Sequence, residues 1–269
     1  LAGRKYGYEP QLVLDTAQKL YEKKLTTYPR SDSEYLPLNQ RKDASAILAH
    51  LRDGDDAALS HWAGGADAKI KSRAWNDKKV TAHHAIIPTR VRARLGTLTE
   101  TEENIYRLIA QAFIAQFYPE HVYEKTRATL DHHGEAFAVN GRREIQAGWR
   151  AIYRTAKKGA GEEADAGDAD GEEEDGGVLP PLKKGDAVAY AGGTLKKRAT
   201  KPPPRFTPAT LLQGMKEIHK YVLDPEAKKR LKDVYGIGTE ATRAAIIDDL
   251  IKRRFLSAKG KKKLLYPTD

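Results

Sequence analysis

A glycine-rich acidic run constrains the fold of this chain more than any other feature of its sequence. Residues 159–177, GAGEEADAGDADGEEEDGG, contain nine of the 37 acids and almost no large apolar side chain. Such a segment cannot bury enough apolar surface to balance the entropy lost on ordering it. We therefore expect a disordered loop at Gly159 to Gly177. Folded segments on both sides share a chain of 269 residues, which is long enough for two or three small domains.

The rest of the chain is strongly basic. Outside the acidic run, 28 acids stand against 47 lysines and arginines, which gives a net charge of +19. This charge suits a polyanion such as nucleic acid, although a solubilising surface is an alternative explanation. The absence of cysteine excludes disulfides, thiolate zinc sites and a cysteine nucleophile. Because there is neither a signal sequence nor an apolar run of about 18 residues, we expect a cytoplasmic protein without a membrane partner.

The first 120 residues are predicted to be mostly helical. Apolar residues recur at helical spacing over Pro10–Lys24, Gln40–Leu51 and Glu100–Phe117. Thr99 and Glu102 form a capping box at the start of the third of these helices. Leu25 to Pro29 has a β-branched, extended pattern, which predicts that the first helix leads into a short strand.

The pattern changes after Val122. Tyr123–Asp131 and Ala136–Arg142 alternate like strands on either side of His132-His133-Gly134, which predicts a hairpin. Trp149–Tyr153 and Ala187–Tyr190 are also strand-like. After Pro202-Pro203-Pro204, Thr207 as N-cap and Pro208 at the first helical position begin a helical segment that runs to about Phe255. The expected fold class is multidomain α+β, with segments 1–122, 123–204 and 205–269.

The acidic run contains a D-x-D pair, Asp168 and Asp170, that resembles part of a metal site. A calcium loop in that register would have Ala166 at its first position and Gly177 at its twelfth, which excludes an EF-hand. A catalytic magnesium pair needs a rigid strand end, and only glycine and alanine flank this pair. We predict no metal site in this chain.

The segment Thr27-Tyr28-Pro29-Arg30-Ser31-Asp32 is the first candidate for chemistry. Pro29 restricts Tyr28 to an extended backbone, so the ring can project from the end of a strand. A phenol, with an ordinary pKa of about 10, is a poor nucleophile at neutral pH. A cation such as Arg30 would stabilise both the phenolate and a phosphorane-like transition state. The alternative is an ordinary half-buried strand tyrosine with Arg30 in a salt bridge.

Two adjacent histidines, His83 and His84, follow Lys78 and Lys79. Side chains of neighbouring residues in an extended segment point to opposite sides. One histidine can therefore reach an active site while the other packs or binds backbone. A metal pair is the alternative, but adjacent residues rarely converge on one ion and no third ligand is near in the sequence.

A third segment runs from Gly236 to Arg243, with the sequence GIGTEATR. It predicts a glycine turn leading into a helix whose first turn carries hydroxyls and a cation. Exposed amides at a helix N-terminus bind phosphate, and threonine and arginine add donors. The alternative is a plain threonine-capped helix in which the glycines only form the turn.

Four segments in register resemble the bacterial type IA DNA topoisomerases, and topoisomerase III more than topoisomerase I. They are LTTYPRSDSEYLP from Leu25, WNDKKVTAHHAIIPT from Trp75, PPPRFTPATLL from Pro202 and GIGTEATRAAII from Gly236. The resemblance covers nearly the whole chain apart from the acidic run. Thr239 occupies a position where topoisomerase I usually has arginine, which favours the topoisomerase III branch.

The resemblance implies catalytic roles for Tyr28, Arg30 and His83. Tyr28 matches the nucleophile that opens one DNA strand through a 5′-phosphotyrosyl bond, Arg30 the cation beside it, and His83 a histidine that assists at the same phosphate. Thr81 stands where an aspartate is common. The residues expected to bind DNA are Ser31, Asp32, Lys78, His84, Arg205, Thr239, Thr242 and Arg243.

The family architecture implies a helical domain that carries the tyrosine, a β-rich arch and a helical segment that binds single-stranded DNA. We find no counterpart of the N-terminal toprim domain, which supplies the acidic Mg²⁺ cluster of the family. We therefore expect a piece of a longer protein, with Mg²⁺ bound by toprim in the full-length enzyme and no cofactor in this chain. By itself the chain is expected to bind DNA without turnover.

For the complete enzyme we expect a nucleoid-associated monomer that relaxes or decatenates DNA, with single-stranded DNA and its own toprim domain as partners. The alternative is a non-catalytic module of the same fold that binds single-stranded DNA. The presence of Tyr28, Arg30 and His83 together favours the enzyme.

Overall fold

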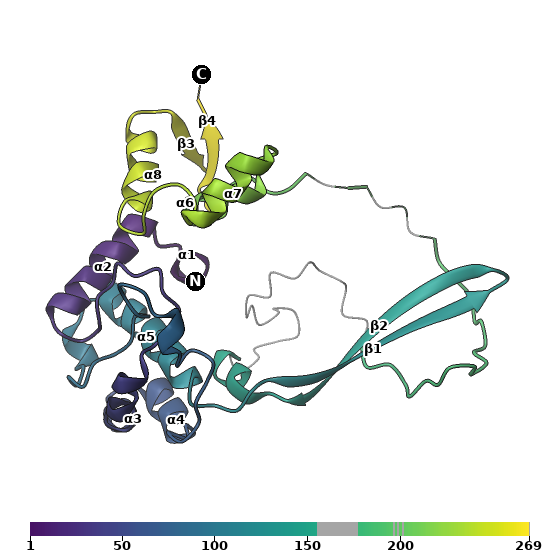
Figure 1. The fold of residues 1–269 in the computed structure, drawn as a ribbon, viewed down its shortest axis with the longest axis horizontal. Coiled ribbons are helices and arrows are strands. Elements are labelled where there is room, and N and C mark those ends of the chain that lie inside the picture. Colours follow the sequence, from purple (N-terminus) through teal and green to yellow (C-terminus); the bar gives the residue numbers. More distant parts are fainter. Residues whose placement is uncertain (155–176, 196, 198, 201, 269) are drawn as a thin grey trace. The chain divides into compact units, whose positions relative to one another are not determined.

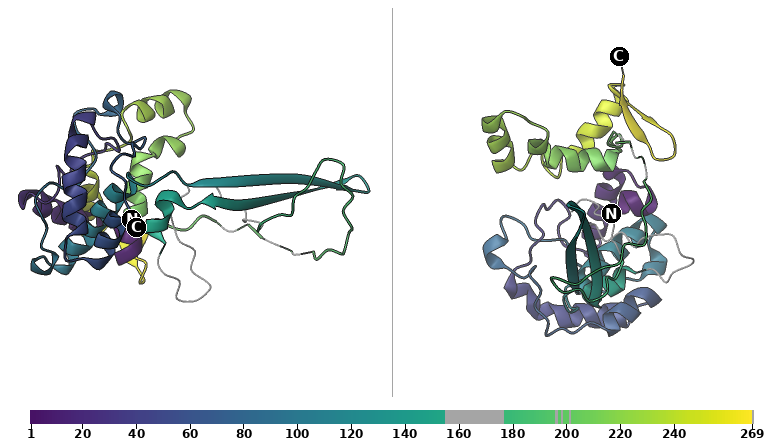
Figure 2. Two further views of the ribbon diagram at one scale, coloured as in Figure 1. Left: turned by 90° about the horizontal axis from the view of Figure 1, so that it is seen from below. Right: turned by 90° about the vertical axis from the view of Figure 1, so that its right-hand side faces the viewer.

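The computed structural model describes residues 1–154, 177–195, 197, 199–200 and 202–268. Its helices and strand pairs confirm the predicted mixture of α and β structure (Figures 1 and 2). The chain divides into two compact units, one formed by residues 1–114 and 202–269 and the other by residues 115–201. The first and last predicted segments thus contribute to one unit. The loop predicted at 159–177 lies, apart from Gly177, outside the described residues.

The N-terminal part of the first unit is helical. Its helices are α1 (Ala2–Tyr6), α2 (Pro10–Glu22), α3 (Ala44–Arg52), α4 (Ala57–Gly64) and α5 (Glu100–Ala115), with 3₁₀ turns η1 (Leu38–Asp43), η2 (Asp77–Lys79) and η3 (Leu95–Thr97). Two predicted helices are confirmed as α2 and α5. The helix predicted from Gln40 begins instead at Ala44, because residues 40–43 form the turn η1. In that turn the Arg41 guanidinium donates to the carbonyl of Lys69 (2.6 Å), so a tertiary contact overrides the local pattern.

Helix α5 begins with the predicted capping box. The Thr99 amide donates to the Glu102 carboxylate (3.0 Å), and the Glu102 amide donates to the Thr99 hydroxyl (3.3 Å). Lys23 Nζ also donates to Glu102 (2.7 Å), which ties the end of α2 to the start of α5. The apolar face of α5 is buried, and this burial raises the pKa of Tyr106 to about 12.

The C-terminal part of the same unit combines helices with a small hairpin. Its elements are α6 (Pro208–Lys216), η5 (Ile218–Lys220), α7 (Pro225–Asp233), α8 (Arg243–Lys252), β3 (Leu256–Lys259) and β4 (Leu264–Pro267). Thr207 caps α6 and Pro208 occupies its first turn, as predicted. The antiparallel hairpin β3–β4 corrects the expectation of a purely helical end. Helix α8 contacts α2 and α6, so this part packs on the helix that leads to Tyr28.

The second unit contains one long antiparallel hairpin, β1 (Val122–His132) paired with β2 (Glu135–Gln146). It confirms the predicted hairpin. Its two turn residues, His133 and Gly134, have φ values of 55° and 84°, as a type I′ turn requires. Among the helices that the structure describes, none has the length and hydropathy to cross a membrane.

Two strands predicted in the second unit are not formed. Residues Gly148–Tyr153 form the 3₁₀ helix η4, because Gly148 has φ 52° and turns the chain where a Cβ would meet the Glu120 carbonyl at 2.3 Å. Residues 187–190 have no strand neighbour, since β1 and β2 form the only sheet found in the described part of this unit. An alternating pattern without a pairing partner does not form a strand.

Candidate active site and nucleic-acid interface

The backbone before Tyr28 is fixed by the segment that carries His83. After α2 ends, Lys24 adopts φ 60° and the chain reverses. The Thr27 amide then donates to the Ile87 carbonyl (2.9 Å), and the Thr89 amide donates to the Leu25 carbonyl (3.0 Å). These bonds form one antiparallel bridge rather than the predicted strand, because Pro29 and Pro88 have no amide hydrogen to extend a ladder.

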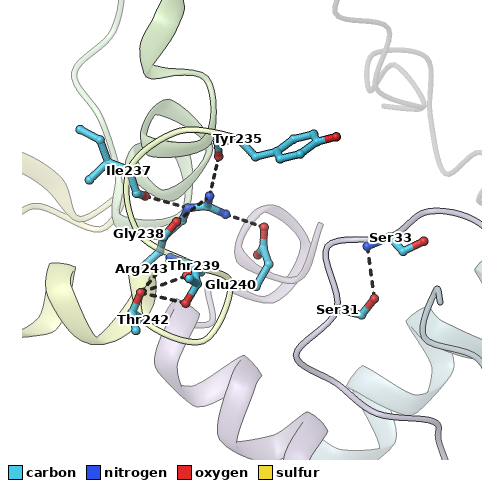
Figure 3. A network of polar contacts seen from close by, with 9 residues as sticks. All are labelled: Ser31, Ser33, Tyr235, Ile237, Gly238, Thr239, Glu240, Thr242 and Arg243. Atoms are coloured by element: carbon cyan, nitrogen blue, oxygen red, sulfur yellow. Dashed lines mark hydrogen bonds and ion pairs between the residues drawn. The ribbon is translucent and has the colours of Figure 1, made fainter. Parts of the chain in front are cut away.

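Polar side chains extend this attachment beyond the bridge. The Thr27 hydroxyl accepts from the Ile87 amide (3.0 Å), and the Ser31 hydroxyl donates to the His84 carbonyl (2.7 Å). The Ala85 amide donates to the Tyr35 carbonyl (2.8 Å). Ser31 thus anchors the loop after Tyr28, and its hydroxyl also accepts from the Ser33 amide (3.2 Å, Figure 3).

The Tyr28 and His83 rings lie against each other at the exposed edge of this arrangement. Their centroids are 4.9 Å apart and their planes differ by 27°, while Tyr21 meets the Tyr28 ring edge-on at 5.7 Å. Tyr28 is 36% exposed, and its hydroxyl has no hydrogen-bond partner among the described residues. Two of the three predicted catalytic side chains, Tyr28 and His83, are therefore neighbours, and the Tyr28 side chain is partly exposed.

Three charged side chains of the Tyr28 and His83 segments are exposed. Arg30, Asp32 and Lys78 make no side-chain hydrogen bond or ion pair with any residue that the structure describes, while the intervening Pro29 is buried. The alternative of an Arg30 salt bridge therefore has no support in the described structure. Arg30 and Lys78 are available to a phosphate, as their predicted roles require.

His84 faces the other way from His83. It is half-buried, with Nδ1 2.8 Å from the Ala85 carbonyl and Nε2 2.8 Å from the Gln40 side-chain nitrogen. These contacts fit a neutral ring that donates from Nδ1 and accepts at Nε2. One histidine thus reaches the site while the other binds backbone, as predicted. A direct contact of His84 with DNA would compete with both of these bonds.

A basic hollow lies beside this segment and was not predicted. It has a volume of about 500 Å³ and is lined by Tyr35, Lys71, Ser72, Arg73, Trp75, Asn76 and Lys79. Lys79 donates to the Tyr35 hydroxyl (2.9 Å) and lies over its ring. The lining has three cations, two aromatic rings and no carboxylate. We name these seven residues the basic hollow; the alternation of Lys71 and Arg73 around a serine was the one signal for it in the sequence.

Arg243 lies inside the glycine loop rather than on its surface (Figure 3). It is 3% exposed, and its guanidinium donates to the carbonyls of Tyr235 (2.7 Å), Ile237 (3.0 Å) and Gly238 (3.0 Å). It also donates to the Glu240 carboxylate (2.5 Å). The sequence predicted a cation that faces DNA, but this guanidinium holds the loop together.

The two threonines of this loop are exposed and bonded to each other. Their hydroxyl oxygens are 3.1 Å apart, and the Thr239 amide donates to the Thr242 hydroxyl (2.8 Å). The predicted turn therefore leads into α8 as expected, with Thr239 and Thr242 at the surface where a ligand can reach them.

A sequence model of the DNA topoisomerase family matches residues 1–269. The chain belongs to the DNA topoisomerase family. It is 41% identical over 273 residues to DNA topoisomerase 3 of Salmonella typhimurium and 40% identical over 261 residues to that of Vibrio cholerae. DNA topoisomerase 3 of Bacillus subtilis is 35% identical over 269 residues. These similarities confirm the resemblance to topoisomerase III, within the type IA class.

The alignments cover 100%, 97% and 96% of this chain, but 39%, 38% and 35% of these three relatives. The topoisomerase chain thus spans less than half the length of the relatives that it matches. It contains all four segments on which the resemblance was based.

Arg205, the remaining predicted DNA-binding residue of this topoisomerase chain, stands at the β3–β4 hairpin. Its guanidinium lies 4.5 Å from the ring centroid of Tyr266, and Lys259 lies over the same ring at 5.1 Å. Arg205 is exposed, so a phosphate can approach it.

The topoisomerase family implies Mg²⁺, but the described residues do not form a site for it. Within them, no three His, Asp or Glu side chains lie close enough together to share a metal ion. The first two acids after Tyr28 in the sequence, Asp32 and Glu34, are single exposed carboxylates. These donors do not fit a magnesium site at Tyr28.

Proposed function

We propose that this chain is part of an enzyme that cleaves one DNA strand, passes another strand through the break and reseals it. The observation that carries the proposal is the partly exposed Tyr28 side chain, whose ring stacks on His83 and whose backbone is fixed by hydrogen bonds to the His83 segment. Membership of the topoisomerase family supports it. An exposed phenol without a partner has no evident structural role, whereas a nucleophile requires this exposure.

The chemical step exchanges one phosphoester bond for another. The Tyr28 oxygen attacks phosphorus, the bond from phosphorus to the 3′ oxygen breaks, and the 5′ phosphate becomes bound to Tyr28. The phenol loses its proton, and the leaving 3′ oxygen gains one. We assign charge stabilisation on the phosphoryl oxygens to Arg30 and assistance with proton transfer to His83. Resealing is the reverse reaction, in which the 3′ hydroxyl attacks and the phenol leaves.

Magnesium, when bound to the complete protein, would stabilise charge during resealing. Because the described carboxylates do not fit such a site, we propose that it lies in the toprim domain of the same polypeptide. The residues of this chain bind and orient the strand.

The strand to be cut is proposed to be single-stranded DNA. Arg30, Lys78, the basic hollow and Arg205 offer cations to its phosphates, and Thr239 and Thr242 offer hydroxyls. Ser31 and Asp32 lie beside the reacting phosphate in this proposal, with Ser31 acting through the loop that it anchors. The enzyme would work as a monomer in the cytoplasm, on the DNA of the nucleoid.

The test uses Tyr28→Phe in the complete protein, with Tyr21→Phe as a matched control. Tyr21 is an exposed tyrosine whose ring touches Tyr28. A single-stranded oligonucleotide labelled at either end is incubated with each variant and denatured. We expect the wild type and Tyr21→Phe to retain the 3′-labelled fragment covalently and to release the 5′-labelled one. We expect Tyr28→Phe to bind the oligonucleotide but form no adduct. A surviving adduct in Tyr28→Phe would exclude the proposed nucleophile, and binding without an adduct in the wild type would favour a non-catalytic module.

A further inference from the structure

Tyr235 has an uncommon backbone conformation and an exposed ring. Its φ is 57°, in the left-handed region that bulky residues rarely adopt, and the residue is 69% exposed. Figure 3 shows the ring pointing away from the polar network of Arg243. Strained residues that a structure holds firmly are concentrated at functional sites.

Three hydrogen bonds hold this conformation. Arg243 donates to the Tyr235 carbonyl (2.7 Å), the Gly236 amide donates to the Leu231 carbonyl (2.8 Å), and the Ile237 amide donates to the Met215 carbonyl (3.0 Å). Gly236 has φ 94°, and a Cβ there would lie 2.3 Å from the Met215 carbonyl oxygen. The loop is therefore clamped from both sides, and the Tyr235 ring remains outside it.

The surroundings of Tyr235 combine apolar and basic groups. Val234 and Ile237, next to it in the loop, are 64% and 47% exposed. Helix α7, which ends two residues before Tyr235, carries four exposed cations, Lys228, Lys229, Arg230 and Lys232, against the acids Glu226 and Asp233. An exposed aromatic ring that directly follows a basic helix suits an unpaired base and its phosphates, whereas a duplex keeps its bases inside the helix.

We propose that Tyr235 is a base-stacking residue that takes the face of one unpaired DNA base, and that Arg243 is the positioning residue that keeps the ring directed outward. The inference rests on the proposed function, because it assumes that the protein binds single-stranded DNA. It assigns a ligand to a residue outside the predicted binding set, and it explains why the loop cation is buried.

The experiment measures binding by the complete protein carrying Tyr28→Phe, so that no cleavage occurs. Single-stranded oligonucleotides carry 2-aminopurine at successive positions, because its fluorescence reports stacking. We expect Tyr235→Leu to weaken binding about tenfold and to change the fluorescence at one position only. The salt dependence should not change, since no charge is lost. Tyr235→Phe should behave like the parent.

Two further variants separate stacking from general damage. Tyr221→Leu is the matched control, because Tyr221 is 60% exposed in the same unit and its ring meets Phe206 edge-on; we expect unchanged fluorescence. Arg243→Lys keeps the charge but loses the geometry of the guanidinium. It should reproduce the effects of Tyr235→Leu, and the double variant should bind little worse than either single one.

The outcomes distinguish this inference from the proposed function. If the parent protein binds no single-stranded DNA, the proposed function fails. If the parent binds but Tyr235→Leu has the same affinity and the same fluorescence at every position, the stacking role is wrong while the proposed function stands. A lower melting temperature of Tyr235→Leu with unchanged DNA binding would show that the ring contacts protein, which also overturns the inference.

Discussion

Two loops of the first unit use their motif residues in opposite ways. Around Tyr28, backbone hydrogen bonds to residues 85–89 fix the chain, so the side chains of Tyr28 and Arg30 are exposed for a ligand. In the loop before α8, the Arg243 side chain binds the backbone, and the Tyr235 ring is exposed instead. An exposed arginine in a motif, such as Arg30, is available to a ligand. A buried one, such as Arg243, shapes the loop instead.

The sharpest test of this difference removes the exposed cation. We expect Arg30→Ala in the complete protein to slow strand cleavage by about 10² to 10³, because the transition state loses a charge-stabilising donor. The melting temperature should not change, since Arg30 has no partner among the described residues. Cleavage is measured in a single turnover, with Arg94→Ala as an exposed arginine control. Equal loss in both variants would contradict a specific role.

Replacing the buried cation, Arg243, should instead lower the stability of the protein. We expect Arg243→Ala to lower the unfolding free energy by about 3 kcal/mol, because Glu240 and three carbonyls lose their donor. Arg253→Ala, at the C-cap of the same helix, removes an exposed arginine and should cost less than about 0.5 kcal/mol. Denaturant unfolding measures both. An Arg243→Ala protein of wild-type stability would show that the guanidinium does not hold the loop.

The basic hollow offers a third test, through charge alone. Lys71→Ala and Arg73→Ala should each reduce the slope of log affinity for single-stranded DNA against log salt by about 0.7. Lys69→Ala, an exposed lysine outside the lining, should leave the slope unchanged. Titrations at several salt concentrations decide this. If both hollow variants had the same slope as the parent, the basic hollow would not contact the phosphates of the DNA.

The smallest expected effect concerns Glu102, which joins Lys23 at the end of α2 to the start of α5. Lys23 and the Thr99 amide lower the pKa of Glu102. Because the folded pKa lies below the unfolded one, the stabilisation is present above the unfolded value of about 4.3 and is lost as the pH falls through the folded value. We expect Glu102→Gln to lower the unfolding free energy by roughly 1 kcal/mol at pH 7 and by less below about pH 4. Exposed Glu100→Gln is the control, and a difference independent of pH would contradict the ion pair.

Local signals in the sequence predicted the elements that depend on local contacts. Helical periodicity and the Thr99–Glu102 capping box predicted α5, and the two-residue turn at His133-Gly134 predicted the long hairpin. The failures have two different causes. The turn at Gly148 depends on a distant contact, a close approach to Glu120. The β3–β4 hairpin is local, but each of its strands has only four residues, too few for a clear alternating pattern.

The candidate site was predictable only in part, because it too depends on distant contacts. The opposite orientations of His83 and His84 follow from an extended backbone, but the stacking of His83 on Tyr28 requires the bridge between two segments 60 residues apart. The burial of Arg243 depends on loop carbonyls that no sequence pattern marks. The basic hollow gathers its lining from residues 35 and 71–79, and only the structure brings them together.

The most direct test of the proposed chemistry identifies the atom that becomes covalently bound to DNA. After reaction of the complete protein with a single-stranded oligonucleotide, nuclease and trypsin are applied and the peptides are fragmented by mass spectrometry. Trypsin cuts after Lys24 and after Arg30, which releases the peptide LTTYPR. Tyr28 is the one tyrosine in this peptide. We expect a nucleotide attached through its 5′ phosphate to Tyr28. An adduct on Thr26, on Thr27 or on a tyrosine of another peptide would contradict it.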